Sequence, residues 1–422
     1  MASANEPAAG RYTVVGLPNQ APTALPAEVQ PLVAAHAVFS GGRRHYELVK
    51  SLLPSPHTWI TIAGDMPALF AEYRTAAAPI LVFASGDPLF FGIVRTIQTH
   101  DPGATVAVFP SFNSVQRLCA KIGQPYEQVR NVSVHGRSWQ ALDEALLRYE
   151  PLLAVLTDAE RTPDAIARRL LEYNFLHYEV VVGEDLDGPH ERIATYSLPE
   201  AAQTEFRPLN CVLLRQTTAP SRPWGLDDAA FVGLPGRPGM ITKKAIRLLS
   251  LAQLGLAGKR VFWDVGFCTG SVAIEACRLF PQLTVVAFEQ RPECKALIEE
   301  NMRQLSALGI AVVMGDFFTQ DLAAYPPPEA VFVGGHGGRL PELLTRLNAL
   351  LPVGGTVVLN AVLEQSHAQF LTQARALGWE VAAPQRVQLD AHNPIWVLTA
   401  SKVARSTGAS LPSPLSEKER GN

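Results

Sequence analysis

The residues from Asp264 to Gly270 read Asp-Val-Gly-Phe-Cys-Thr-Gly. They follow the apolar run 261–263 and precede residues 271–277, whose spacing predicts a helix. A strand, a glycine loop and a helix in this order form a cradle for a nucleotide-like ligand at the carboxyl end of a parallel strand. The segment therefore predicts an α/β fold with a ligand site at this loop.

The carboxylate of Asp264 distinguishes between two classes of ligand. A dinucleotide brings a pyrophosphate to such a loop, and an acid beside the first glycine repels it. S-adenosylmethionine instead carries an ammonium and a sulfonium, which an acid attracts. The loop therefore favours a methyltransferase that uses S-adenosylmethionine. An NAD-dependent oxidoreductase is the alternative, and it requires a G-x-G-x-x-G loop without a nearby acid.

The composition is typical of a soluble protein with two or three globular domains, because the chain has 422 residues, 47% of them hydrophobic and 18% charged. A net charge of −3 argues against a nucleic-acid partner. The sequence has neither a long apolar run nor a signal-peptide pattern in residues 1–10, so we expect no membrane association. We expect a cytoplasmic protein with free thiols and no metal, because no C-x-x-C pair or metal-type spacing occurs among Cys119, Cys211, Cys268, Cys277 and Cys294.

A polar segment that contains prolines, residues 216–223, predicts a linker near the middle of the chain. We therefore assign residues 11–215 to a first domain, 216–225 to the linker and 226–400 to a second domain. Residues 401–422 are rich in Ser, Pro and charge and are assigned to a disordered tail.

Strand and helix patterns alternate in both domains. In the first, they predict strands at 12–16, 79–84, 105–109, 152–156, 179–183 and 209–214, and helices at 28–35, 113–122 and 163–171. In the second, they predict strands at 261–264, 284–289, 311–314, 330–333 and 356–360, and a helix at 292–308. This alternation predicts a doubly wound parallel sheet, the Rossmann type, in the second domain.

Polar residues follow the first strands of this predicted sheet. Glu289 ends the second strand, where an acid can accept hydrogen bonds from both ribose hydroxyls. Asp316 and Phe317 follow the third strand, where they can flank an adenine. Thr269 lies at the start of the helix after the glycine loop, whose N–H groups favour the methionyl carboxylate. These residues, with Asp264, form the predicted cofactor site.

Two further segments carry a specific resemblance. Residues 239–247 read Gly-Met-Ile-Thr-Lys-Lys-Ala-Ile-Arg, and residues 331–338 read Val-Phe-Val-Gly-Gly-His-Gly-Gly. Both resemble the C-terminal half of the precorrin-6Y methyltransferases, decarboxylating enzymes of cobalamin biosynthesis. The resemblance implies that Thr242, Gly266, Gly270 and Glu289 contact S-adenosylmethionine. The chain departs from the family at 267–268, where Phe and Cys replace small residues.

The second of these segments also supplies candidates for the substrate and for catalysis. Gly334 and Gly335 let a ligand approach the backbone closely, so we expect them at the substrate. His336 can donate to a substrate carboxylate, and Asn360 at the end of the fifth strand is a similar catalytic candidate. A structural role is the alternative for both, since a lone histidine is more often structural.

The first domain contains Ser85-Gly86-Asp87-Pro88 after an apolar strand. Pro88 favours an extended Asp87, and Gly86 permits a turn that other residues avoid. The segment resembles the Ser-Gly-Asp-Pro loop of the tetrapyrrole methylases. That family's fold implies two α/β subdomains with S-adenosylmethionine in the cleft between them. Ser85, Gly86 and Asp87 are then cofactor-binding residues, with Asp87 also a catalytic candidate.

Basic residues beside the loops suggest a polyanionic substrate. Precorrins carry many acetate and propionate groups, and the guanidinium fork of arginine matches a carboxylate. In a slightly acidic protein, we therefore expect the tetrapyrrole to be bound by Arg43, Arg44, His135, Arg137 and Lys243, and the same argument extends to Lys244 and Arg247.

Together the resemblances imply the fused, bifunctional form of the family. Each domain then has its own S-adenosylmethionine site, and the chain methylates precorrin-6Y at ring positions 5 and 15 and decarboxylates the position-12 acetate, giving precorrin-8. The family assigns position 15 and the decarboxylation to the second domain and position 5 to the first. We also expect a homo-oligomer. Because the loop 15–19 keeps a single glycine, the alternative is a first domain that only binds and a second that alone is catalytic.

Overall fold

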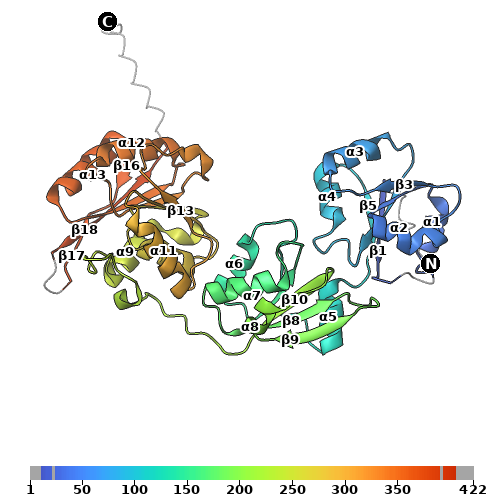
Figure 1. Ribbon diagram of the computed structural model, residues 1–422. Helices are drawn as coiled ribbons and strands as arrows, with labels where there is room; N and C mark the ends of the chain where they lie inside the picture. The colour runs from blue at the N-terminus through green and yellow to red at the C-terminus, as the bar shows by residue number, and fades with distance from the viewer. Residues whose placement is uncertain (1–10, 21–23, 390–392, 405–422) are drawn as a thin grey trace, which may run out of the picture. The chain divides into compact units, whose positions relative to one another are not determined.

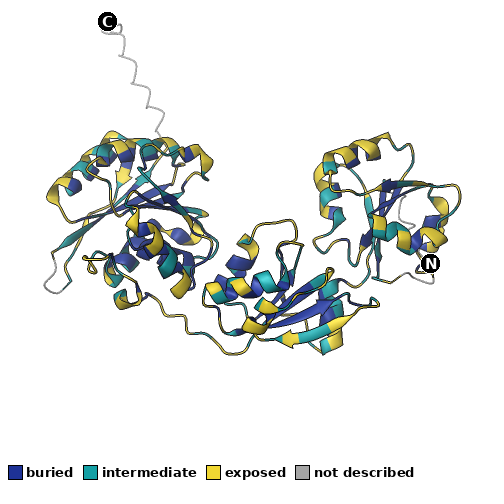
Figure 2. Cartoon of the chain, viewed as in Figure 1, coloured by how far each residue is buried: buried dark blue, intermediate teal, exposed yellow. Residues whose placement is uncertain are grey.

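The computed structural model describes residues 11–20, 24–389 and 393–404, and the chain forms two compact units, Met1–Pro220 and Ser221–Asn422 (Figure 1). The central strands of each sheet are buried, while most of the helices expose their outer faces (Figure 2). Among the described residues, no helix has both the length and the apolar character that crossing a membrane requires.

The first unit begins with a five-stranded parallel sheet of order β3-β2-β4-β1-β5. Central strand β4 is buried on both faces: Ile80 and Val82 pack into one core cluster and Leu81 and Phe83 into another. Such two-sided burial explains its continuous apolar sequence. The elements are β1 (Tyr12–Leu17), α1 (Gln30–Ala35), β2 (Val38–Gly41), α2 (Arg43–Val49), η1 (Lys50–Leu52), β3 (Thr58–Thr61), α3 (Met66–Thr75), β4 (Ile80–Ser85), α4 (Ile93–His100) and β5 (Val106–Phe109).

The first unit continues with a second, mixed sheet of order β6-β7-β10-β8-β9, in which β10 runs antiparallel to β7 and β8. Helix α5, the first element of this part, begins with a capping box between Asn113 and Gln116. The elements are α5 (Ser114–Ile122), β6 (Arg130–Ser133), α6 (Gln140–Leu147), β7 (Leu152–Leu156), α7 (Pro163–Glu172), β8 (Tyr178–Glu184), β9 (Arg192–Tyr196), α8 (Leu198–Gln203) and β10 (Asn210–Gln216).

The second unit is built on one sheet of order β13-β12-β11-β14-β15-β18-β16, with β17 paired to β18. Helices α12 and α13 cover one face, and α9 and α11 cover the other (Figure 1). The elements are η2 (Asp228–Ala230), α9 (Lys244–Leu254), η3 (Leu256–Gly258), β11 (Val261–Val265), α10 (Ser271–Leu279), β12 (Thr284–Glu289), α11 (Glu293–Gln304), β13 (Ala311–Met314), η4 (Leu322–Ala324), β14 (Ala330–Val333), α12 (Leu340–Leu350), β15 (Thr356–Ala361), α13 (Glu364–Ala376), β16 (Trp379–Val381), β17 (Gln385–Val387) and β18 (Ile395–Lys402).

The predicted α/β class and the doubly wound core are confirmed, with one correction at the sheet edge. Strands β11 to β15 are parallel as predicted, but β18 runs antiparallel to β15 and to β16. The sequence did not indicate this edge, because β16 and β17 are each three residues long and lack a clear alternation.

Three residues lie in strands rather than in the segments that the sequence assigned to them. Gln216 pairs with Tyr178 at the end of β10, although it was placed in the linker. Ser401 pairs with Thr356 and Lys402 with Trp379 in β18, although both were placed in the tail. In each case a partner strand distant in sequence extends the element. The part of the tail from residue 405 lies outside the described residues, and the domain limits stay a prediction.

Candidate functional site

A cavity of about 650 Å³ lies at the carboxyl ends of β11, β12, β14 and β15 in the second unit. Parallel α/β sheets bind their ligands at this edge. The cavity brings together most residues that the sequence assigned to this unit: Thr242, Lys243, Asp264, Gly266, Thr269, Glu289, Asp316, Phe317, Gly334, Gly335, His336 and Asn360.

The two glycines of the loop after β11 have different roles. Gly266 has φ +79°, and a Cβ there would lie 2.5 Å from Gly335 N, so the loop after β14 can approach only a glycine. Gly270 has φ +73°, but a Cβ there would meet Ile298 Cγ1 of α11 at 2.4 Å. Gly270 is also not among the described residues that line the cavity. Gly270 thus allows the loop to pack closely against α11, and its expected contact with the cofactor stays a prediction.

Asp264 is buried and holds the start of helix α10. Its side chain is 1% exposed, and Oδ2 accepts a hydrogen bond from Ala273 N at 3.0 Å. Burial raises the pKa of Asp264 to about 7, with a smaller contribution from the charge of Glu289, and the bond from Ala273 N only partly opposes the shift. The sequence argument treated Asp264 as a permanent anion, whereas its burial makes the charge depend on pH near neutrality.

Glu289 is ionised, and protein groups already donate hydrogen bonds to both of its carboxylate oxygens. Its Oε2 accepts from Cys268 N at 3.0 Å and Arg291 Nη2 at 2.7 Å, and its Oε1 accepts from Gln290 N at 2.9 Å and Arg291 N at 3.1 Å. Burial alone would raise the pKa of Glu289, but the hydrogen bonds and charge of Arg291 hold it below its usual value. Arg291 thus occupies carboxylate oxygens that we had expected to accept hydrogen bonds from ribose. Although Arg291 lies only two residues after Glu289, the sequence does not show which way its side chain turns.

Phe317 lines the cavity, but most of its ring is buried, and its expected place beside an adenine stays a prediction. Its ring packs in the core against Trp263 at 6.4 Å and Phe288 at 5.1 Å between centroids, and the residue is 7% exposed. The neighbouring Phe318 is less buried and also lines the cavity, with the Arg339 guanidinium 3.6 Å from its ring centroid. Sequence reasoning missed Phe318 because consecutive residues in a loop carry no burial pattern.

Four polar atoms of this cavity are buried without a hydrogen-bond partner among the described residues: Asp264 Oδ1, Thr269 Oγ1, His336 Nδ1 and Asn360 Nδ2. Leaving a buried polar atom unpaired costs about 1–3 kcal/mol, so such a cluster points to a polar ligand. Burial lowers the pKa of His336 below its usual value, so this histidine is neutral at pH 7. The free carboxylate oxygen and the hydroxyl beside a helix start fit the ammonium and carboxylate of a methionyl group.

The predicted basic residues of this unit are not equivalent. Lys243 lines the cavity, and its Nζ lies 3.8 Å from Asp228 Oδ2. Lys244 Nζ is paired with Asp227 at 2.9 Å. Arg247 is 0% exposed and bonds to Glu275 and to backbone carbonyls, so its expected contact with a substrate is wrong. The charge of Arg247 is paired with that of Glu275 inside the fold, because a buried guanidinium needs a counter-charge.

A second cavity of about 680 Å³ lies in the first unit. Among the predicted residues, its lining includes Arg44, Ser85, Gly86, Asp87, His135 and Arg137. Arg43 is exposed and is not among the described residues of this lining, so the structure does not bring it to the site. Helix α2 presents Arg43 and Arg44 in different directions, because consecutive helical residues do not share a face.

The Ser-Gly-Asp-Pro loop after β4 is fixed by bonds to both neighbouring loops. Gly86 has φ +59°, its N–H donates to Leu17 O at 2.9 Å, and its carbonyl accepts from Ser111 N at 3.2 Å. A Cβ at Gly16 would lie 1.9 Å from Gly86 O, so the one glycine kept in the loop after β1 permits this approach. Asp87 Oδ1 accepts from Leu89 N at 2.9 Å and so caps the turn.

His45 supports Ser85 and was not foreseen. Its Nδ1 accepts from Gly42 N at 3.1 Å, so the ring proton lies on Nε2, which donates to Ser85 Oγ at 2.9 Å. Burial, aided by the charge of Arg44, lowers the pKa of His45 to about 4, which keeps the ring neutral. The Ser85 hydroxyl proton can then point to a ligand. No sequence signal marks this pair, since its members are 40 residues apart.

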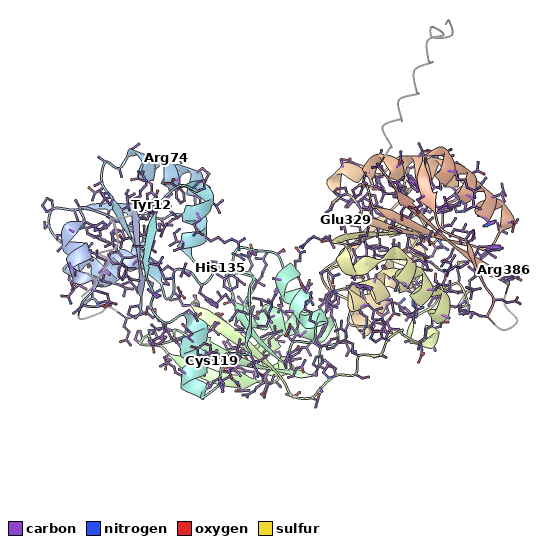
Figure 3. All side chains as sticks on the ribbon, turned by 180° about the vertical axis from the view of Figure 1, so that it is seen from behind. Tyr12, Arg74, Cys119, His135, Glu329 and Arg386 are labelled. Atoms are coloured by element: carbon purple, nitrogen blue, oxygen red, sulfur yellow. The ribbon has the colours of Figure 1, made fainter. Side chains whose placement is uncertain are left out.

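The remaining basic residues of this cavity are held by polar or aromatic partners. Arg44 Nη2 donates to Asn19 O at 3.2 Å, and Asn19 Nδ2 donates to Asp185 Oδ1 at 2.7 Å. His135, labelled in Figure 3, donates from Nδ1 to Thr157 O at 2.8 Å. The Arg137 guanidinium lies 5.4 Å from the ring centroid of Phe91. Among the described residues, the contact given for the Arg137 guanidinium is this aromatic ring and not a carboxylate, so its charge is available to an anion.

These two cavities, each at a glycine turn at the carboxyl end of a parallel sheet, define a fused pair of ligand-binding α/β units. A family model described as tetrapyrrole (corrin/porphyrin) methylases matches residues 13–202, and one described as precorrin methyltransferase domain matches residues 236–407. A Sinorhizobium protein named precorrin-6Y C(5,15)-methyltransferase [decarboxylating] is 30% identical over 93% of this chain and 94% of its own length. The chain belongs to the family of precorrin-6Y C(5,15)-methyltransferases [decarboxylating].

Two relatives from Salmonella typhimurium match shorter parts of the chain. The cobalt-precorrin-7 C(5)-methyltransferase is 32% identical over 203 residues, which are 48% of this chain and 97% of that protein. The cobalt-precorrin-6B C(15)-methyltransferase (decarboxylating) is 33% identical over 145 residues, which are 34% of this chain and 74% of that protein. The family is one of methyltransferases, so the NAD-dependent alternative is discarded.

Proposed function

We propose that this chain methylates precorrin-6Y at ring positions 5 and 15 and decarboxylates the position-12 acetate, giving precorrin-8. The observation that supports this most directly is the presence of two separate cavities, one in each unit and each beside a glycine turn, with unpaired buried polar atoms in the cavity of the second unit. The family of the chain and the printed names of its relatives point to the same reaction.

S-adenosylmethionine is the proposed donor in both units, and when bound it supplies an electrophilic methyl group. In the second unit, Asp264 Oδ1 would accept from the donor's ammonium, and Thr269 Oγ1 with the N-terminal amides of α10 would hold its carboxylate. In the first unit, the Ser85 hydroxyl and the backbone around Gly86 would hold the donor. The number of donor sites per chain is part of the proposal.

The reaction requires alignment more than strong acid–base catalysis, because the reduced macrocycle is already nucleophilic. Correct positioning of two reactants lowers a barrier by about 7–11 kcal/mol. In the second unit, the backbone at Gly334 and Gly335 and the polar side chains of His336 and Asn360 would position the ring and the acetate. His336 is neutral, so it would donate one hydrogen bond to that acetate without adding a charge.

The substrate's acetate and propionate groups would be received by cations at the rims of the cavities. Arg137, Arg44 and His135 serve this role in the first unit and Lys243 in the second. Arg43 is not included, because it lies outside the described lining.

We assign position 15 and the decarboxylation to the second unit and position 5 to the first. The two Salmonella relatives support this division, because each is named for one of these reactions; the C(5) relative matches 203 residues, a length close to that of one unit, and the C(15) relative matches 145. Assembly as a homo-oligomer and a cytoplasmic location stay predictions. Light scattering of the purified chain tests the first of these.

The full-length chain, incubated with precorrin-6Y and a donor carrying a ¹³C-labelled methyl group, tests the proposal. Mass spectrometry should show the gain of two methyl groups and the loss of one carbon dioxide, and NMR should place label at positions 5 and 15. Variants Gly86→Val and Gly266→Val, one per unit, should remove label from position 5 and position 15 respectively. If Gly86→Val leaves both positions labelled, the first unit is a binding scaffold; absence of any methyl transfer by the unchanged protein contradicts the proposal.

A further inference from the structure

Residues 226–243, which we call the strap, connect the linker to helix α9 and form one wall of the cavity in the second unit. Their regular structure is limited to the short helix η2 and a single bridge between Leu234 and Arg237. The end of the strap, from Gly239 to Lys243, lines the cavity and includes Thr242. A segment with so few backbone bonds of its own depends on outside contacts for its position.

The first contact of the strap is with a buried ion pair between helices α9 and α10. Arg247 on α9 is 0% exposed and Glu275 on α10 is 1% exposed, with Nε and Oε2 at 3.1 Å. Glu275 accepts from Leu226 N at 3.0 Å, while Arg247 donates to the carbonyls of Leu226 and, at 2.7 Å, of Thr242. The pair therefore binds both ends of the strap at once.

The second contact is Asn301 on α11, which is 0% exposed. Its Oδ1 accepts from Val232 N at 2.7 Å, and its Nδ2 donates to Val232 O at 3.1 Å and to Thr269 O at 2.9 Å. The donor Val232 N fixes which way the amide points. One side chain thus joins the middle of the strap to the glycine loop that opens the cavity.

We propose that Asn301 and the Arg247–Glu275 pair are positioning residues that hold the strap and the glycine loop in register, and so set the shape of the donor cavity in the second unit. This inference rests on the proposed function for the identity of the donor. Three helices, α9, α10 and α11, each contribute one side chain to this network, and α10 itself begins at the glycine loop. Any shift of the strap moves Thr242 relative to Asp264, which lines the same cavity.

Asn301→Asp tests the proposal in the full-length chain. The substitution keeps the shape and the acceptor for Val232 N, but it places carboxylate oxygen against the carbonyls of Val232 and Thr269. We expect the KM for S-adenosylmethionine in position-15 methylation to rise by about tenfold to a hundredfold. The loss of a buried hydrogen bond and the displacement of residues that line the cavity have effects of that order. Position-5 methylation by the same chain should be unchanged and serves as the internal reference.

Asn348→Asp is the matched control. Asn348 lies on α12 in the same unit, and its Oδ1 accepts from Trp379 Nε1 at 2.9 Å, a bond that aspartate can keep. It is not part of the cavity lining. Hydrogen exchange should accelerate in peptides covering residues 226–243 and 266–270 for Asn301→Asp and not for Asn348→Asp. A purely structural role would accelerate exchange throughout the unit instead.

A second variant covers the case in which Asn301→Asp does not fold. Arg247→Lys keeps the charge beside Glu275 but cannot reach Leu226 O and Thr242 O together, so the same rise in KM and the same local exchange are expected. If both variants transfer methyl to position 15 with the unchanged KM, the inference is overturned while the proposed function stands. If the unchanged protein transfers no methyl to position 15, the proposed function fails first.

Discussion

Arg291 donates two hydrogen bonds to the carboxylate of Glu289, from Nη2 to Oε2 at 2.7 Å and from Nε to Oε1 at 3.2 Å. The same carboxylate accepts from the backbone N–H groups of Cys268, Gln290 and Arg291. An ionised carboxylate offers about four acceptor positions, so this one is full. Ribose hydroxyls that bind to Glu289 must therefore replace part of the Arg291 contact.

Replacing Arg291 by methionine should strengthen donor binding to the second unit. The variant removes two of the five hydrogen bonds to Glu289, and one hydrogen bond regained from a ribose hydroxyl corresponds to about a twofold to tenfold lower Kd. Calorimetry with S-adenosylmethionine measures the change, and Glu289→Gln should act in the opposite direction. Weaker binding by Arg291→Met would show that the arginine instead holds Glu289 in place for the donor.

Donor affinity should depend on pH through Asp264. Because burial raises the pKa of Asp264 to about 7, the ionised form that attracts an ammonium becomes more populated as pH rises. We expect Kd in the second unit to fall by about fivefold to tenfold between roughly pH 6 and pH 7.5. Asp264→Asn should bind more weakly and lose this dependence; a variant with the same pH profile as the unchanged protein contradicts the assignment.

The same residue should affect stability with a defined sign. The pKa of Asp264 rises from about 3.9 in an unfolded chain to about 7 in the fold. Between these values the folded state binds more protons, so the contribution of Asp264 to stability falls as pH rises. Asp264→Asn should therefore raise Tm at pH 7.5 relative to the unchanged protein and have little effect at pH 4, as calorimetric melting can measure.

Gly266→Ala should damage both stability and activity. The position combines φ +79° with backbone atoms of Gly335 within 2.8 Å of the added Cβ, so we expect about 3 kcal/mol less stability and no position-15 methylation. Gly354→Ala is the control, because Gly354 has φ +82° but nothing within 4 Å. It should cost only about 1 kcal/mol in urea unfolding and leave activity unchanged. Equal effects of the two variants would mean that the close approach to Gly335 is unimportant.

Arg137 and Arg43 should differ in their effect on the substrate. Arg137 lines the cavity of the first unit, whereas Arg43 is exposed outside its described lining. Arg137→Gln should raise the KM for the tetrapyrrole in position-5 methylation by about tenfold, the loss expected for a charge-assisted hydrogen bond. Arg43→Gln should leave it unchanged. A rise for Arg43→Gln of similar size would indicate a general electrostatic effect instead of a specific contact.

Local sequence was sufficient to predict the main strands and the glycine turns of both units. The order of strand, glycine loop and helix around Gly266, and the turn at Gly86 after β4, follow from apolar runs and from residues with unusual backbone preferences. Both are properties of neighbouring residues, so they are visible without the fold. The strand order placed Glu289, and the family resemblance placed Thr242 and Ser85, at cavities that the structure contains.

Only the tertiary structure determined what those residues can do. The charge of Asp264 depends on its burial, and the acceptors of Glu289 depend on where the side chain of Arg291 turns. We expected Arg247 to bind the substrate, but it lies inside the fold beside Glu275. No sequence pattern indicated the contact of Asn301 with the glycine loop. Burial and long-range pairing arise from segments far apart in the chain, so periodicity and spacing do not encode them.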